Sequence, residues 1–280
     1  MKKIFAIFFS VLAITACSKH DPVLPDVQHD IFDTKGTEMD FKPNFDLLGQ
    51  IKPQVSQSPY VAIYRRGKKT LVYMADFHGE KESWDMVDWC FSDQFEIKPD
   101  ILLTEFEHTG RRLTNSPTNT LTHAAFVAER HNIPVVLSDL SDDEKLGVLG
   151  DGADVDYLDK VLHSEPKFDG DDLEKANAKL NKYGRNPFML QNIASALNKY
   201  DTVFCIFGEG HLREQQDVLN DMFGNAPEYI TEFPENTRTE YGENKQDVFN
   251  NGKSNVMNKM QEMKIIKLVD FNETKGKENG

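Results

Sequence analysis

Short apolar runs alternate with amphipathic stretches through the middle of the chain. The short runs predict strands, at residues 60–64, 71–74, 101–104, 135–137 and 203–207. The amphipathic stretches have apolar positions at helical spacing and predict helices, at residues 83–95, 120–131, 187–200 and 212–223. Strands that alternate with helices in this way are typical of βα units. The predicted fold class is therefore α/β, with a mostly parallel central sheet flanked by helices.

One long segment interrupts this alternation. Residues 141–184 are acidic and contain a helical pattern at 172–183. An insertion of this length in an α/β fold usually caps a site or decorates an edge of the sheet. We therefore predict a single α/β domain over residues 58–271 with a helical insertion at 141–184. The polar residues 272–280 are predicted to be a disordered tail.

The N-terminus has the order of a secretory signal. Lys2 and Lys3 precede an apolar run at residues 4–13, and small residues lead to Cys17. This run is too short for a stable membrane span. The pattern resembles the lipobox of bacterial lipoproteins; the alternative is an ordinary signal peptide with a chance cysteine. The resemblance implies a signal peptide at 1–16, acylation of Cys17 with chains such as palmitate, and a tether over 17–57.

The lipobox resemblance also implies a location. Acylated Cys17 would attach the protein to a membrane of the bacterial cell envelope. Ser18 follows the cysteine where an aspartate is the usual retention signal of Gram-negative lipoproteins, which favours the outer membrane, facing the periplasm.

Composition and charge narrow the class of partner. Apolar residues make up 39% of the chain and aromatic residues 10%, which excludes a mostly disordered protein. The formal charge of −14 opposes binding to nucleic acid, so no nucleic-acid partner is predicted.

Cys90 and Cys205 lie in apolar runs and are expected to be buried free thiols, although an oxidising periplasm would permit a disulfide between them.

Polar groups follow four of the predicted strands. His78 follows residues 71–74, Glu105 follows 101–104, Asp139 follows 135–137, and His211 follows 203–207 after Gly208 and Gly210. Ligands of open α/β sheets gather at the carboxyl ends of the strands. Although a lone histidine at a strand end is more often a structural cap, two of them on different βα units favour a functional site.

These residues allow two kinds of chemistry. Two imidazoles and a carboxylate can hold Mn, Co or Zn and activate a bound water molecule. Without a metal, the same groups can act as general base and acid. Arg111 and Arg185 suit a carboxylate or an oxyanion, with salt bridges to Glu105 or Glu107 as the equal alternative.

The order and spacing of the motifs resemble the TraB/TIKI superfamily, which includes GumN/TraB, erythromycin-esterase-like and ChaN-like proteins. The resemblance covers residues 60–233 and rests on four short motifs: Ala75-Asp76-Phe77-His78, Pro99-Asp100 leading to Glu105 with Arg111, Arg185-Asn186 with Met189, and Gly208-Glu209-Gly210-His211. Ala75 departs from the pattern, because relatives have glycine there.

The resemblance implies an envelope hydrolase that cleaves an ester or amide bond in a small-molecule or peptide substrate. His78, Glu105 and His211 would hold a divalent metal or share acid/base work. The remaining motif residues would have other roles. Arg111, Arg185 and Asn186 would orient the substrate, and Asp139 would orient a histidine from the side away from the metal or substrate. The alternatives are a ChaN-like lipoprotein that binds haem or iron without hydrolase activity, and a structural lipoprotein that has lost the chemistry.

Overall fold

A mixed six-stranded sheet forms the centre of the molecule. The computed structural model describes residues 40–78, 81–108, 120–234 and 264–269. Within this part the strand order is β4-β3-β5-β2-β1-β6. The strands are β1 (Tyr60–Arg66), β2 (Lys69–Asp76), β3 (Ile101–Glu107), β4 (Val135–Asp139), β5 (Thr202–Gly208) and β6 (Glu228–Ile230). Strands β2 to β5 are mutually parallel, and β1 and β6 add an antiparallel edge. The predicted α/β class with a mostly parallel sheet is confirmed.

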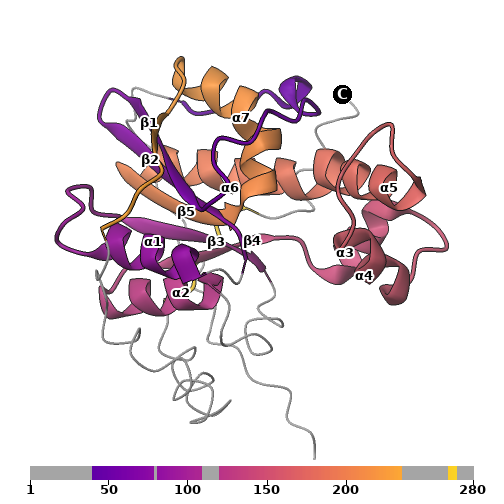
Figure 1. Ribbon diagram of the computed structural model, residues 1–280, viewed down its shortest axis with the longest axis horizontal. Helices are drawn as coiled ribbons and strands as arrows, with labels where there is room; N and C mark the ends of the chain where they lie inside the picture. Colours follow the sequence, from indigo (N-terminus) through magenta and orange to yellow (C-terminus); the bar gives the residue numbers. More distant parts are fainter. Residues whose placement is uncertain (1–39, 79–80, 109–119, 235–263, 270–280) are drawn as a thin grey trace, which may run out of the picture.

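Helices cover both faces of the sheet (Figure 1). Helices α1 (Lys81–Phe91) and α2 (Thr120–Arg130) pack on one face, and α6 (Asn186–Lys199) and α7 (Glu209–Phe223) pack on the other. Each face has its own apolar layer. Cys90 lies in the first layer and Cys205 in the second, so the two thiols are buried, free and separated by the sheet.

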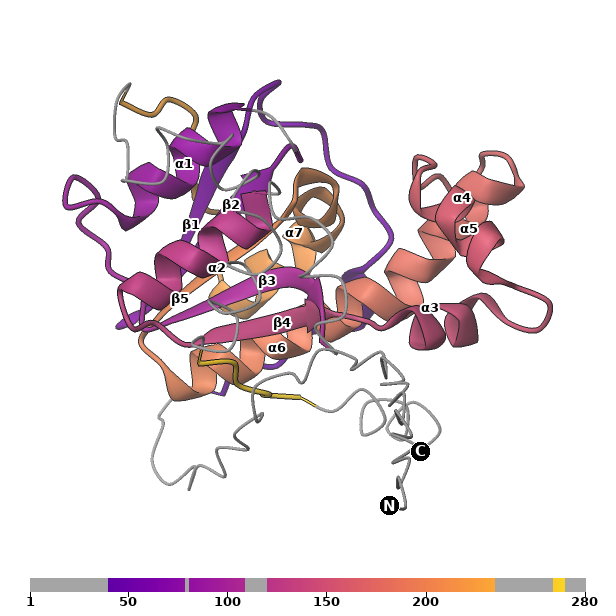
Figure 2. The same cartoon turned by 90° about the horizontal axis from the view of Figure 1, so that it is seen from below.

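The helical insertion extends from the β4 edge of the sheet (Figure 2). It contains α3 (Asp142–Leu149), α4 (Val155–Leu162) and α5 (Asp172–Leu180), which pack around a small apolar core of their own. We call these three helices the lid. Helix α5 continues through a π-helical segment, η2 (Asn181–Arg185), directly into α6. The lid is therefore joined rigidly to a helix of the main domain.

The packed domain begins earlier than predicted. Phe41 and Leu48 are 2% and 5% exposed and belong to the core, and Phe41 packs against Phe223 with ring centroids 5.3 Å apart. The prediction of a tether up to residue 57 was therefore wrong for residues 41–48. Isolated apolar residues in a polar segment leave no periodicity to detect. A short 3₁₀ helix, η1 (Phe45–Leu47), lies in this segment.

Several predictions fall outside the described residues. These are the signal peptide 1–16, Cys17 with the first part of the tether, and the tail 272–280. None of the helices in the described part is long and apolar enough to cross a membrane.

Candidate functional site

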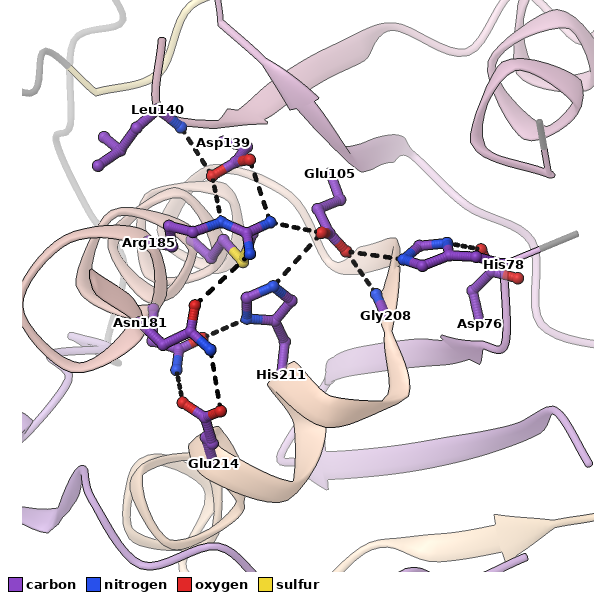
Figure 3. Close-up of polar contacts among 12 residues, drawn as sticks. Asp76, His78, Glu105, Asp139, Leu140, Asn181, Arg185, Gly208, His211 and Glu214 are labelled. Atoms are coloured by element: carbon purple, nitrogen blue, oxygen red, sulfur yellow. Dashed lines mark hydrogen bonds and ion pairs between the residues drawn. The ribbon is translucent and has the colours of Figure 1, made fainter. Parts of the chain in front are cut away.

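The predicted polar residues meet at one edge of the sheet (Figure 3). Strands β2 and β5 align Asp76 beside Gly208, and β3 and β4 align Glu107 beside Asp139. The carboxyl ends of these four parallel strands therefore lie together, as the sequence predicted.

Glu105 lies at the centre of the cluster. Its Oε1 accepts a 2.6 Å hydrogen bond from Arg185 Nη2 and lies 3.3 Å from His211 Nε2. Its Oε2 accepts a hydrogen bond from the Gly208 backbone N–H and lies 3.9 Å from His78 Nε2. Burial alone would raise the pKa of this carboxyl, but His211, Arg185 and His78 outweigh burial and hold the pKa well below its usual value. Glu105 therefore stays ionised.

His78 is held by the strand that precedes it. Its Nδ1 lies 2.6 Å from Asp76 Oδ2. Nδ1 faces this carboxylate as the hydrogen-bond donor, and Nε2 lies on the other side of the ring, toward Glu105. The Asp76 side chain is fully buried, whereas half of the His78 side chain is exposed. Burial lowers the pKa of His78, but the hydrogen bond to Asp76 and the charges of Glu105 and Asp76 together raise it to about 9.

His211 is held by a buried amide. Asn186 donates from Nδ2 to Glu214 Oε2 at 2.7 Å, which fixes its Oδ1 as an acceptor. That oxygen accepts from His211 Nδ1 at 2.7 Å and from Gln215 Nε2 at 2.8 Å. The ring consequently directs Nε2 toward Glu105. Asn186 is fully buried, so the prediction that it orients substrate was wrong: it orients His211.

Asp139 supports an arginine rather than a histidine. Its carboxylate accepts from Arg185 Nε at 3.0 Å and Nη2 at 3.1 Å, and Lys145 Nζ lies 2.8 Å away. The predicted support of a histidine by Asp139 was therefore wrong, because both oxygens face cations. Arg185 forms the salt bridge to Glu105 that was one of its two predicted roles. Arg111 lies outside the described residues.

Glycine is required at position 208 because a side chain there would come too close to neighbouring side chains, and not because of the backbone conformation. Its φ of −53° is accessible to any residue. A Cβ at this position would lie 3.0 Å from His78 Nε2 and 3.2 Å from Glu105 Oε2. By contrast, a Cβ at Gly210 would meet nothing within 4 Å. The first glycine of the motif therefore makes room for the histidine and the glutamate.

A cavity of about 680 Å³ opens beside this cluster. The strand ends form one wall, with His78, Glu105 and His211. The lid contributes another part of the lining, with Lys145 from α3, Asp159 and His163 from the end of α4, and Asn177 from α5. This volume lies within the range of small-molecule sites.

Comparisons with protein-family models, curated proteins and solved structures found no match to this chain. The resemblance to the TraB/TIKI superfamily therefore stays a prediction from the sequence motifs.

The candidate metal ligands are the two histidines and Glu105. Among the described residues, no group of three or more His, Cys, Asp or Glu side chains is placed to hold a metal. His78 and His211 approach different oxygens of Glu105, and those oxygens accept hydrogen bonds from Gly208 and Arg185. A carboxylate oxygen has a second lone pair, so it can accept such a hydrogen bond and still be a metal ligand. The geometry is suited to acid/base chemistry, and metal ligation by these three residues stays a prediction.

The supporting partners of the site were not predicted from the sequence. They are Asp76, Lys145, Asn181, Glu214 and Gln215. Glu214 and Gln215 follow His211 by three and four residues on one helix, a spacing that places side chains on the same face. That spacing was a usable signal. Lys145 and Asn181 come from the lid region, and no sequence pattern connects them to the strand ends.

Proposed function

We propose that this protein hydrolyses ester or amide bonds, with His78 as general base and Asp76 as the residue that orients it. The observation that carries this proposal is the hydrogen bond from His78 Nδ1 to the buried Asp76, which leaves Nε2 as the basic nitrogen of the neutral ring in a residue that lines the cavity. A carboxylate that fixes the tautomer and orientation of a histidine is the arrangement that hydrolases use to activate a nucleophile.

The reaction would proceed by direct attack of water. Neutral His78 accepts a proton at Nε2 from a water molecule, and the water oxygen attacks the carbonyl carbon. The carbonyl oxygen becomes an oxyanion in the tetrahedral intermediate. His78 then returns the proton to the leaving alcohol or amine as the bond to carbon breaks. A carboxylic acid and an alcohol or amine are released.

Arg185 is the described residue best placed to stabilise the oxyanion. It lines the cavity, and its Nη1 has only a weak 3.5 Å contact to Asn181 Oδ1. Its other nitrogens are fixed by Glu105 and Asp139, which hold the guanidinium in a defined orientation. A pre-oriented donor of this kind stabilises developing negative charge without reorganisation.

The departure at Ala75 is compatible with this proposal. Ala75 is fully buried in the apolar layer beneath α6 and α7 and does not line the cavity. Its methyl group therefore leaves the reaction space clear. The motif order of the TraB/TIKI resemblance supports the same reaction class.

The haem-binding alternative gains no support from the cavity. Tyr157 and Tyr183, the tyrosines of the insertion that could serve as axial ligands, are not among the described residues that line it. We further propose, from the N-terminal sequence alone, that acylated Cys17 places the hydrolase on the cell envelope, where it would meet envelope substrates.

The test is turnover of activated esters and anilides by the purified chain, compared with the His78→Gln variant. We expect activity that survives a chelator and falls at least 100-fold in His78→Gln. His163→Gln, which changes a histidine on the lid wall, should keep the rate constant of the chemical step. Near-stoichiometric transition metal that is lost in a His78→Ala/His211→Ala double variant, with activity lost on chelation, would replace this mechanism with a metal-assisted one.

A further inference from the structure

A chain of buried hydrogen bonds runs behind His211, on the side of the ring away from the strand ends (Figure 3). Glu214 Oε2 accepts from Asn186 Nδ2 at 2.7 Å, and Asn186 Oδ1 accepts from both His211 Nδ1 and Gln215 Nε2. Gln215 Oε1 in turn accepts from the Tyr73 hydroxyl at 3.2 Å. The most exposed of these side chains belongs to a residue that is 7% exposed, so water scarcely competes for the bonds.

Only one member of this chain cannot reverse its role. An amide can rotate and exchange its oxygen with its nitrogen, and a tyrosine hydroxyl can donate or accept. If the amides of Asn186 and Gln215 rotated together, the bonds among the neutral side chains could form in the opposite sense. A carboxylate only accepts, so Glu214 requires a donor from Asn186 and excludes the reversed chain. The direction of the chain is therefore determined at Glu214.

A second amide holds Glu214 from the lid side. Asn181 donates from Nδ2 to Glu214 Oε1 at 3.0 Å, and the Asn181 Oδ1 lies 3.5 Å from Arg185 Nη1. Rotation of this amide would place its nitrogen against the guanidinium, so Asn181 is fixed as a donor to Glu214. Both oxygens of Glu214 thus receive a donor, and the carboxylate is fixed in position from two sides.

The chain holds the proton of neutral His211 on the nitrogen away from Glu105. His211 Nε2 lies 3.3 Å from Glu105 Oε1. A neutral ring without the chain would therefore have its proton on Nε2 and donate it to that carboxylate. With the proton held on Nδ1, Nε2 keeps its lone pair. A general base and a metal ligand both act through this lone pair, so either chemistry predicted for the site requires this tautomer.

We propose that Glu214 is a positioning residue that keeps the proton of neutral His211 on Nδ1, through the amide of Asn186. Only the kinetic consequence rests on the proposed function, because the tautomer can be measured without turnover. A glutamate with a merely structural role would stabilise the fold and leave the choice of nitrogen to Glu105.

The tautomer is measured by ¹⁵N NMR of the His211 ring in the full chain, assigned with His211→Gln. The pH is raised above 9, where His78 is neutral as well, until one nitrogen of the His211 ring has lost its proton. We expect the remaining proton on Nδ1 in the wild type and on Nε2 in Glu214→Gln, whose amide can donate to Asn186 and reverse the chain. A proton on Nε2 in the wild type, or on Nδ1 in folded Glu214→Gln, would overturn the proposal.

Two tyrosines of the same apolar layer provide the controls. Tyr73→Phe removes the far end of the chain, but Glu214 still determines its direction, so the proton should stay on Nδ1 of His211. Tyr64→Phe removes a buried hydroxyl that has no hydrogen-bond partner among the described residues, so the tautomer and kcat should both stay at wild-type values. A proton on Nε2 in Tyr73→Phe would show that the chain is not governed from Glu214.

A double variant tests whether the position of the carboxylate decides the tautomer. Glu214→Gln should lower kcat about 10- to 100-fold, as is usual when the partner that orients a histidine is changed. Glu214→Gln/Asn186→Asp moves the carboxylate one step along the chain and again gives His211 Nδ1 a partner that only accepts. The proton should return to Nδ1, and most of the lost kcat should be recovered. Failure of the folded double variant to restore the Nδ1 proton would contradict the proposal.

The two readouts separate this proposal from the hydrolase proposal. A reversed tautomer in Glu214→Gln, without turnover of any ester or amide by the wild type, would support the positioning role and remove the hydrolase. Equal turnover by the wild type and Glu214→Gln, with the tautomer reversed, would keep the hydrolase and overturn the role of Glu214 in its reaction.

Discussion

Replacing Gly208 with alanine tests how closely the site is packed around His78. To restore an ordinary contact of 3.4 Å, His78 Nε2 would have to move by about 0.4 Å and Glu105 Oε2 by about 0.2 Å. Glu105 is held by Arg185 and by the Gly208 N–H, whereas His78 is half exposed. The histidine should therefore move, and its hydrogen bond to Asp76 should be distorted.

Gly208→Ala should have two measurable effects. The pKa of His78 should fall from about 9 toward its ordinary value of 6.5, because the Asp76 hydrogen bond contributes to the raised value. The value of kcat/KM, measured well above pH 9, should fall about 10- to 100-fold, because small displacements of a catalytic group are costly. The pKa is measured by NMR titration of the His78 ring proton, assigned with His78→Gln, and kcat/KM with an activated ester.

Gly210→Ala is the matched control two residues away. Its methyl group meets no atom within 4 Å, so both the His78 pKa and kcat/KM should stay at wild-type values. The substitution should instead stabilise the first turn of α7 by about 0.5–1 kcal/mol, since alanine favours helix. If Gly208→Ala matched Gly210→Ala in both measurements, the cluster would tolerate the methyl group and the argument from close approach would be refuted.

Four further predictions concern the charges of the site. Because His78 acts in its neutral form and its pKa is raised to about 9, kcat/KM should rise about tenfold per pH unit from pH 7 to 8 and level off above about 9; a flat profile would exclude His78 as the base. The raised pKa of His78 also stabilises the fold; this contribution is complete below the unfolded pKa of about 6.5 and is lost as the pH rises through about 9. Between these pH values the Tm of the wild type should therefore fall by more than the Tm of His78→Gln. Asp76→Asn should lower kcat about 10³- to 10⁴-fold at unchanged fold by circular dichroism, and retained kcat would show that Asp76 does not orient the base. Glu105→Gln should lower the free energy of unfolding in urea by about 1.5–3 kcal/mol because buried Arg185 keeps Asp139 but loses its ion pair with Glu105, whereas a loss below 1 kcal/mol would contradict the central role of this carboxylate.

The sequence predicted the strands well but placed the ends of β3 and β4 too early. The apolar run of β3 stops at Thr104, yet the strand continues to Glu107, which lies beside Asp139 of β4. The backbone ladder thus extends into the part of the strand whose side chains belong to the site. Hydrophobic pattern detects burial in the core and has no signal for this extension.

The sequence was enough to predict that His78, Glu105 and His211 converge, because each follows a strand of a mostly parallel sheet and parallel strands end at a common edge. The partner of each side chain did not follow. Asp139 and Asn186 were assigned to a histidine and to substrate, whereas they hold Arg185 and His211. These pairings depend on side-chain directions across elements that are distant in sequence, and a single sequence contains no record of them.

The unbroken helical path from α5 through η2 into α6 limits which deletions and substitutions in the lid this protein can tolerate. Arg185 is the last residue of η2, and Lys145 reaches Asp139 from within the lid. Deleting the lid would remove a buried cation from Asp139 and leave the helix that contains Arg185 with a new N-terminus. A lidless form should therefore lose the geometry of the strand-end cluster as well as its cover. Exchange of exposed residues on α4, at positions such as Asp159, offers a less disruptive route to a different ligand preference, in the laboratory or in evolution.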